Sequence, residues 1–178
     1  MDKRRVEVYV QDYFHESSPK EVITNGDENA RICTQTWENW FCEWVDIMKS
    51  DIPLASMYEI GLRLTDKTEI QALNSQYRHQ DKPTDVLAFA ALEVDSPQLT
   101  VQEASESLYL GDIVVSVDTA MRQAIQQGHS LKTELAWLVS HGLLHLIGWD
   151  HPDEESLQRM LIKQVILLKT ISIDIDIE

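Results

Sequence analysis

The sequence predicts an α/β fold of the α+β kind, in which a small mixed sheet of about four strands is covered by about five helices. Short segments in which apolar residues alternate with polar ones are interleaved with longer segments of helical apolar spacing. Their order, β-α-β-α-β-β-α-α-α, is typical of a sheet packed against helices. Because 178 residues are enough for one well-buried core, we expect a single domain over residues 1–178.

The N-terminal part is predicted to form a strand, a loop and a helix. Val6, Val8 and Val10 alternate with other residues, as in a strand with one buried face. Residues 11–29 are polar and rich in turn-forming pairs, which predicts a long loop. A helix is expected over about residues 30–49. Its apolar residues recur at helical spacing and predict a core stripe rather than a base-stacking surface: Trp37, Trp40, Phe41, Trp44, Val45 and Met48.

The next segments are predicted to form a strand, a helix and another strand. Apolar residues alternate over residues 60–64, as in a strand. Asp66 and Glu69 have the spacing of a capping box, at the start of a helix that we expect to end near Arg78. A short strand is predicted over residues 86–90.

The chain between these strands and the longest helix contains two connections and two further elements. Residues 82–85 are turn-forming, and the acidic, polar residues 93–107 predict a loop. A fourth strand is expected over residues 108–117 and a helix over 117–127. Residues 131–148 are apolar almost all round, which predicts a buried, central helix.

The C-terminal part is predicted to form one more helix and a tail. Ser130 is the expected N-cap of the central helix, and Pro152 with the acidic residues after it predicts where the last helix begins. The tail, residues 171–178, alternates apolar with polar residues and is either an added strand or a frayed end. The last helix is expected to turn these residues inward: Leu157, Met160, Leu161, Val165 and Leu168.

The composition argues against some classes of function. There are 15 basic and 30 acidic residues, so the net charge is −15, which repels nucleic acid at long range. The longest apolar stretch, Leu135–Ile147, is shorter than the roughly 20 residues that a bilayer needs, so no membrane partner is expected. Cys33 and Cys42 are about 13 Å apart on a helix, beyond the roughly 7 Å limit for a disulfide. Reduced thiols predict a cytoplasmic protein.

Three of the six histidines form a pattern typical of metal ligands, H-x3-H-x2-G-x2-H. His141 and His145 leave the same face of the central helix, one turn apart. Gly148 lets the chain leave the helix, so that His151 can point back at the pair. Three neutral imidazoles leave a fourth position for water on a zinc ion, as in catalytic sites. We therefore expect one zinc per chain on these histidines.

The spacing also resembles that of the metzincin zinc peptidases. Their motif has a glutamate directly after the first histidine, which activates the attacking water. Here that position is Gly142, so the general base of a peptidase is missing.

Three blocks of the sequence carry a family resemblance. Residues 141–151 read HGLLHLIGWDH, residues 73–78 and 82–89 read LNSQYR and KPTDVLAF, and residues 110–116 read LGDIVVS. They are similar, in that order, to the signature, the central block and the strand segment of the YbeY-type endoribonucleases, also called ribosomal RNA maturation factors. The blocks occur in the family's order. Departures are Ala88 and Ala90, where serine and proline are expected, and the longer loop at residues 11–29.

The resemblance implies a small mixed sheet, a zinc ion and metal-dependent cleavage of single-stranded RNA. It also implies roles in maturing the 3′ end of small-subunit ribosomal RNA and in ribosome quality control. The family's functionally important arginine corresponds to Arg78, whose planar guanidinium can bind a phosphate with two donors. The nucleophile can be water or a ribose 2′-hydroxyl. Ser140 and Asp150 are candidates to orient the ligand rings, and helix-end or turn hydrogen bonds explain them equally well.

Binding of ribosomal RNA has to overcome the acidic net charge. Arg63 and Lys82 are candidate substrate-binding residues near Arg78, but acidic residues lie among them. We therefore expect weak, salt-sensitive binding, helped by the small ribosomal subunit or one of its proteins. Two alternatives stay open: a ribosome assembly factor without enzymatic activity, whose metal is structural, and a zinc hydrolase that acts on peptides or small molecules.

Overall fold

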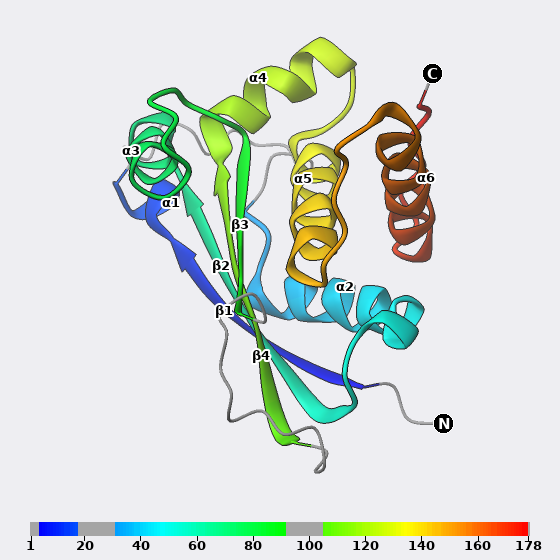
Figure 1. Cartoon of the computed structure of the whole chain (residues 1–178). Coiled ribbons are helices and arrows are strands. Elements are labelled where there is room, and N and C mark those ends of the chain that lie inside the picture. The colour runs from blue at the N-terminus through cyan, green and yellow to red at the C-terminus, as the bar shows by residue number, and fades with distance from the viewer. Residues whose placement is uncertain (1–3, 18–30, 92–104, 178) are drawn as a thin grey trace.

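The computed structural model describes residues 4–17, 31–91 and 105–177 and contains the predicted mixed sheet (Figure 1). Strands β1 (Arg5–Asp12), β2 (Ala55–Thr65) and β4 (Ser105–Ser116) run parallel. Strand β3 (Val86–Ala90) pairs antiparallel with β4. The order across the sheet is β1-β2-β4-β3, so β3 lies at an edge.

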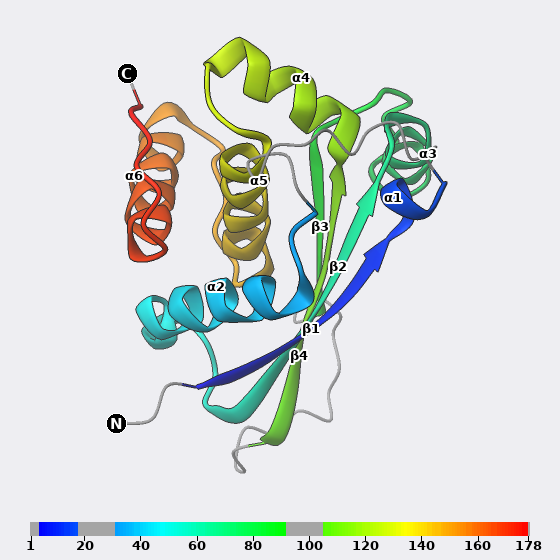
Figure 2. The ribbon, with the colours of Figure 1, turned by 180° about the vertical axis from the view of Figure 1, so that it is seen from behind.

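Helices cover both faces of this sheet, as Figures 1 and 2 show. On one face α5 (Leu131–Leu146) packs against β3 and β4, and α2 (Thr34–Ile47) packs against β1. Helix α6 (Glu154–Thr170) lies outside α5 and also contacts α2. On the other face α3 (Lys67–Arg78) packs against β3 and β4. Helix α4 (Val117–Gln127) lies at one end of the sheet, where it contacts α5 and α3. Helix α5 is therefore central, as predicted.

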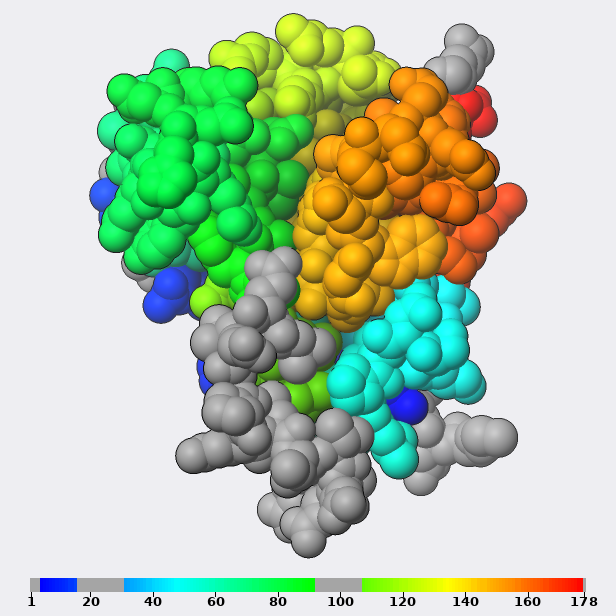
Figure 3. Space-filling model, in the orientation of Figure 1, coloured from blue at the N-terminus to red at the C-terminus, as the bar shows by residue number. Residues whose placement is uncertain are grey.

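The arrangement brings segments distant in sequence to one surface. In the space-filling view, the green residues of α3 and β3 face the orange residues that follow α5 across a shallow seam (Figure 3).

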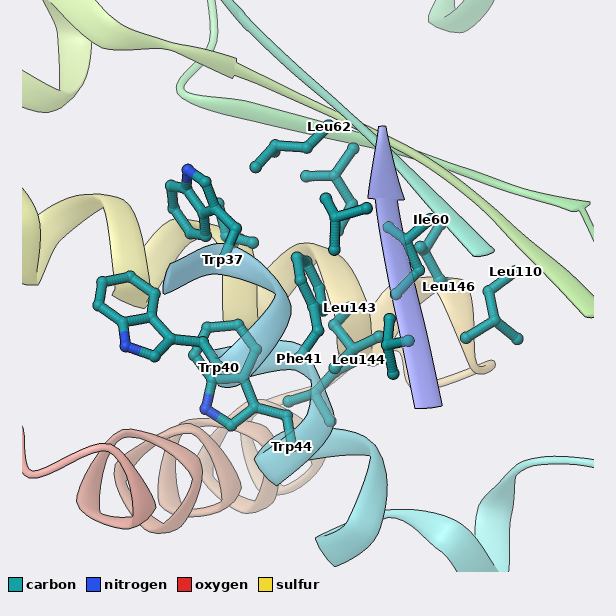
Figure 4. Close-up of a cluster of buried hydrophobic side chains, with 14 of the residues drawn as sticks. Trp37, Trp40, Phe41, Trp44, Ile60, Leu62, Leu110, Leu143, Leu144 and Leu146 are labelled. Carbon is teal, nitrogen blue, oxygen red and sulfur yellow. The ribbon is translucent and has the colours of Figure 1, made fainter. Parts of the chain in front are cut away.

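The core lies between α2, α5 and the sheet (Figure 4). The predicted aromatic stripe of α2 is buried there, because Trp37, Phe41 and Trp44 have no exposed surface. The indole of Trp44 donates a hydrogen bond of 2.9 Å to the Leu167 carbonyl, which ties α2 to α6. Burial of three large rings at one helix face contributes several kcal/mol and fixes α2 beside α5.

The predicted helix starts are confirmed at three places. Asp66 accepts from the Glu69 N–H at 2.9 Å, and Ser130 accepts from the Thr133 N–H at 3.1 Å. Asp153 caps α6 in a full capping box. The expected return bond of a capping box at α3 is replaced, because the carboxylate of Glu69 accepts from Arg63 instead.

Several predicted boundaries need correction. The loop predicted over residues 11–29 is wrong at its start, because β1 continues to Asp12 and α1 (Tyr13–Ser17) follows. Asp12 makes this possible by accepting from the His15 N–H at 3.0 Å. Residues 18–30 and 92–104 lie outside the described chain, and with them most of both predicted loops. Strand β4 begins at Ser105, because its backbone pairs with β2 although polar residues give no alternation there.

The tail and the last helix also differ from expectation. Residues 171–177 form no strand, and Ile171, Ile173 and Ile175 pack against the core instead of fraying. In α6, Met160 and Leu168 are buried as predicted, whereas the other three predicted residues are half-buried. A short 3-10 helix, η3 (Lys49–Asp51), follows α2. No helix in the described residues has the length and apolarity needed to cross a membrane.

Candidate metal centre

The three predicted histidines lie together at the C-terminal end of α5. The Nε2 atoms of His141 and His145 are 3.0 Å apart. His151 comes from the segment between α5 and α6, and its ring centroid is 5.4 Å from that of His141 and 5.3 Å from that of His145. Gly148 has φ 100°, where glycine carries no Cβ penalty, and it reverses the chain toward the helix.

This cluster could hold a metal ion. One ring nitrogen of each histidine lies within 4.8 Å of the other two. A tetrahedral metal with bonds of about 2.0–2.1 Å needs nitrogens about 3.3 Å apart, which small ring movements from this geometry achieve. Three imidazoles and no fourth clustered ligand among the described residues are the donor set of an open site.

A buried amide on α6 fixes the ring of His141. The Oε1 atom of Gln164 is 3.0 Å from Nδ1 of His141, and its Nε2 donates to the Trp137 carbonyl at 3.1 Å. Because the amide nitrogen is used as a donor, Oε1 accepts from Nδ1–H of the ring. Nε2 of His141 is then the free, unprotonated nitrogen that a metal needs.

The surroundings favour the neutral form of two of the imidazoles, His141 and His145, without a metal. Burial lowers the pKa of His141, and the nearby His151 lowers it further, although Gln164 and Asp85 act in the opposite direction. Burial together with the charges of the other two rings lowers the pKa of His145 to about 4. Neutral rings are the form that binds metal ions, so the site is prepared for one at neutral pH.

Ser140 and Asp150, the two residues proposed to orient the ligand rings, form hydrogen bonds with backbone atoms instead of the rings. The hydroxyl of Ser140 donates to the Trp137 carbonyl at 2.8 Å, the same acceptor that holds Gln164. The carboxylate of Asp150 accepts from the backbone N–H of His151 at 2.8 Å. Asp150 thus shapes the turn that carries His151, and Ser140 is connected to the His141 ring through the Trp137 carbonyl and Gln164.

The histidines open into a groove between β3 and the segment after α5. A cavity of about 400 Å³ is lined by all three histidines, Val86 and Ala88. A second cavity, of about 440 Å³, is lined by the same two strand residues, His145 and Arg78. Because the two cavities share Val86, Ala88 and His145, they form one continuous groove, which follows the seam in Figure 3.

Arg78 stands at the far side of this groove, as the last residue of α3. Its Nη2 donates to the carbonyl of Ala88 at 2.6 Å, and its guanidinium lies 5.1 Å from the ring centroid of Phe89. His79 ends the helix in the left-handed region with φ 58°. These contacts hold an exposed guanidinium over the edge of β3, beside the groove of the histidines.

The two other candidate cations are placed differently. Arg63 lies on β2, where it donates to Glu69 at 2.8 Å and to Gln11 at 3.1 Å, and it lines a cavity other than this groove. Lys82 is exposed in the turn before β3, where its carbonyl accepts from Asn74 at 3.0 Å. The structure therefore brings Arg78, but not Arg63, into the groove of the histidines.

Two residues of the site were not among those that the sequence indicated. Gln164 is one, and the signal was a polar residue on the inward stripe of the last helix. The other is Asp85, which lines the histidine cavity and accepts from Val86 N–H at 2.8 Å and from Gln123 at 3.3 Å. Its place in a turn-forming segment gave no reason to connect it with histidines 56 residues or more away.

Fold and site together define a class: α/β proteins with a three-histidine centre that could hold a metal, on a central helix beside an arginine-lined groove. The family model described as "Endoribonuclease YbeY" matches residues 22–172. The chain belongs to the YbeY endoribonuclease family, so the resemblance found in the sequence is confirmed.

Relatives match over nearly the whole chain. Proteins named "Endoribonuclease YbeY" from Trichormus variabilis and Nostoc sp. are each 61% identical over 173 residues, covering 97% of this chain and 98% and 94% of theirs. The solution structure of TM1509 from Thermotoga maritima matches with a TM-score of 0.52 and 25% identity, covering 92% of this chain and 88% of that chain. It supports the mixed α/β fold.

Proposed function

We propose that this chain is a zinc-dependent endoribonuclease that cleaves single-stranded RNA. Its relatives are named endoribonucleases, and one observation of the structure carries the proposal: Arg78 and His145 line the same groove. A phosphodiester lying in that groove meets a cation-binding cluster on one side and a guanidinium on the other.

Each residue of the site can take one of the roles that phosphodiester cleavage requires. His141, His145 and His151 would hold zinc, which when bound supplies a Lewis acid and activates water. Negative charge develops on the non-bridging oxygens during cleavage, and the guanidinium of Arg78 can donate two hydrogen bonds to them. Gln164 keeps His141 in the required tautomer.

Position 142 gives a structural reason against peptide hydrolysis. Gly142 lines the histidine cavity with its backbone, and a Cβ there would lie 2.8 Å from Cγ2 of Ile113 on β4. The position therefore has no side chain, and little room for one, to serve as the general base that zinc peptidases place at this point of the motif. RNA cleavage is therefore the better supported hydrolysis.

We further propose that the substrate is ribosomal RNA, at the 3′ end of the small-subunit RNA and in ribosome quality control, in the cytoplasm. The family resemblance supports this choice. The net charge of −15 opposes tight binding of free RNA. A small-subunit protein or the subunit itself would supply the missing affinity by holding the RNA near the groove.

The experiment compares the parent protein with Arg78→Ala at matched zinc content on a single-stranded RNA. We expect the variant to bind zinc normally and to cleave about 100-fold more slowly, because one charge-stabilising donor is lost. Arg159→Ala is the matched control, since Arg159 is exposed on α6 away from the groove. Equal cleavage by Arg78→Ala and the parent would remove Arg78 from the mechanism, and cleavage unaffected by zinc removal would leave the metal a structural role.

A further inference from the structure

A second cavity lies on the other face of the sheet, beneath α3. It has a volume of about 550 Å³, within the range of about 300–1,000 Å³ usual for ligand sites. Ile113 faces α5, so its neighbour Asp112 points to the opposite face, where Leu73 and Tyr77 of α3 also line the cavity. Figures 1 and 2 show α3 and α5 on opposite sides of the sheet.

The strand register explains why a cavity forms here. Tyr9 lies opposite Gly61, Gly61 opposite Asp112, and Asp112 opposite Phe89, so the four residues form one row across the sheet. A Cβ at residue 61 would lie 2.0 Å from Oδ1 of Asp112, which means that the carboxylate leans over the glycine. The floor of the cavity is thus the Asp112 carboxylate lying over the backbone of Gly61, with Tyr9 and Phe89 at the two ends of the row.

Neighbouring residues of β3 line the cavity and the groove of the histidines. The ring of Phe89 lines the cavity, and the neighbouring Ala88 lines the groove on the other face of β3. The guanidinium of Arg78 lies 5.1 Å from the Phe89 ring centroid and also contacts the Ala88 carbonyl, so it bridges the two sites around the strand edge. Arg63 also lines the cavity, where its guanidinium is paired with Glu69.

We propose that this cavity binds a guanine base of the single-stranded RNA whose neighbouring phosphate contacts Arg78. The inference rests on the proposed function. Aromatic rings such as Tyr77, which is 53% exposed, offer stacking surfaces for bases. An ionised carboxylate only accepts hydrogen bonds, and guanine presents two adjacent donors, N1–H and the 2-amino group, on one edge. Uracil, cytosine and adenine place an acceptor next to their donor on that edge.

The carboxylate has capacity for this contact. Its described partner is Tyr109, whose pKa is raised by burial and by its hydrogen bond to Asp112. A carboxylate has about four acceptor sites, so a phenol and two guanine donors can share it. The guanidinium of Arg78 can offset part of the repulsion between the carboxylate and the RNA backbone, whereas Arg63 is already paired with Glu69.

The test uses the full chain, labelled with ¹⁵N, and titrates it with GMP, AMP and UMP. We expect GMP to shift the amides of Gly61 and Asp112 and to bind at least about fivefold more tightly than AMP or UMP, and Asp112→Asn to abolish this preference. Asp174→Asn, an exposed charge change in the tail, is the matched control. If Asp112→Asn does not fold, Tyr77→Ala tests the same cavity from α3.

A second arm separates this inference from the proposed function. In a cleavage assay, replacing guanosine by inosine in the RNA removes the 2-amino group and should raise KM without changing kcat. Zinc-dependent cleavage with no preference among the three nucleotides would overturn the guanine site and leave the nuclease intact. GMP binding at Gly61 by a protein that cleaves no RNA would support the site and contradict the nuclease. If a basic peptide shifted the amide signals of Gly61 and Asp112 in the ¹⁵N titration and GMP did not, the proposal would be overturned in favour of a protein-binding surface.

Discussion

The amide of Gln164 determines which nitrogen of His141 faces the other two histidines. It is fully buried and uses its own N–H to bind Trp137, so its carbonyl oxygen is left to accept from the ring. We predict that Gln164→Leu lowers zinc affinity about 10- to 100-fold, the usual effect of losing such a partner. Competition with a chromophoric chelator measures it.

Gln158→Leu on the exposed side of α6 is the control for this change and should leave zinc affinity intact. Unaltered affinity in Gln164→Leu would show that the ring needs no partner. Sequence alone indicated the ligands, because three histidines shared one motif. It did not indicate Gln164, because contact across 23 residues depends on how α6 packs against α5.

His145 gives the metal-free protein a pH dependence of stability. Its pKa falls from the ordinary 6.5 to about 4 in the folded chain, so between these values the unfolded chain binds the extra proton. The free energy of unfolding should therefore decrease as the pH falls from 6.5 toward 4. Urea titrations in a chelator, on the parent and His145→Gln, measure this, and identical pH profiles for both would contradict it.

At the scale of elements, the close contact between α5 and β4 positions the histidines. Gly142 allows it, because a Cβ there would approach Ile113 to 2.8 Å. We predict that Gly142→Ala lowers the free energy of unfolding by about 1–3 kcal/mol, because overpacking outweighs the gain in helix propensity. Chemical denaturation of the variant measures the loss, with Gln127→Ala on exposed helix surface as control. A variant more stable than the parent would show that α5 can move away from β4 without cost.

Helix and strand positions followed from periodicity wherever a buried face repeated along the chain. The tryptophan stripe of α2, the apolar α5 and the valines of β1 gave strong patterns, and the structure confirms all three. Periodicity failed where backbone or side-chain hydrogen bonds decide, as in the polar start of β4 and at α1, which Asp12 helps to begin. That residues 1–178 form one domain stays a prediction.

For the whole molecule, charge governs how RNA is bound. The chain has 30 acidic and 15 basic residues, and among the described residues Arg78 is the arginine that lines the groove beside His145. We predict that log K for single-stranded RNA falls with log[salt] with a slope of only about −1 to −2, because each phosphate contact contributes about −0.7. Fluorescence anisotropy with labelled RNA measures the slope. Arg78→Ala should make the slope shallower by about 0.7. If the variant and the parent had the same slope, Arg78 would not contact a phosphate of the bound RNA.

The sheet order also had to come from the structure, because periodicity along one segment does not say which strands are neighbours. That order puts β3 at the edge beside α5, and this is what lets a residue of α3 reach the groove of the histidines. The sequence motif predicted the cluster and the family resemblance indicated Arg78, but their meeting across the edge of β3 is a property of the tertiary fold.

The most direct test of the account is a zinc titration of the chelator-treated protein, with bound metal and RNA cleavage followed in the same samples. We predict that cleavage rises in proportion to bound zinc, saturates at one zinc per chain, and is absent from His141→Ala, which should bind no zinc at the same concentrations. Full cleavage before zinc is added, or one zinc per chain bound by His141→Ala with undiminished cleavage, would contradict it.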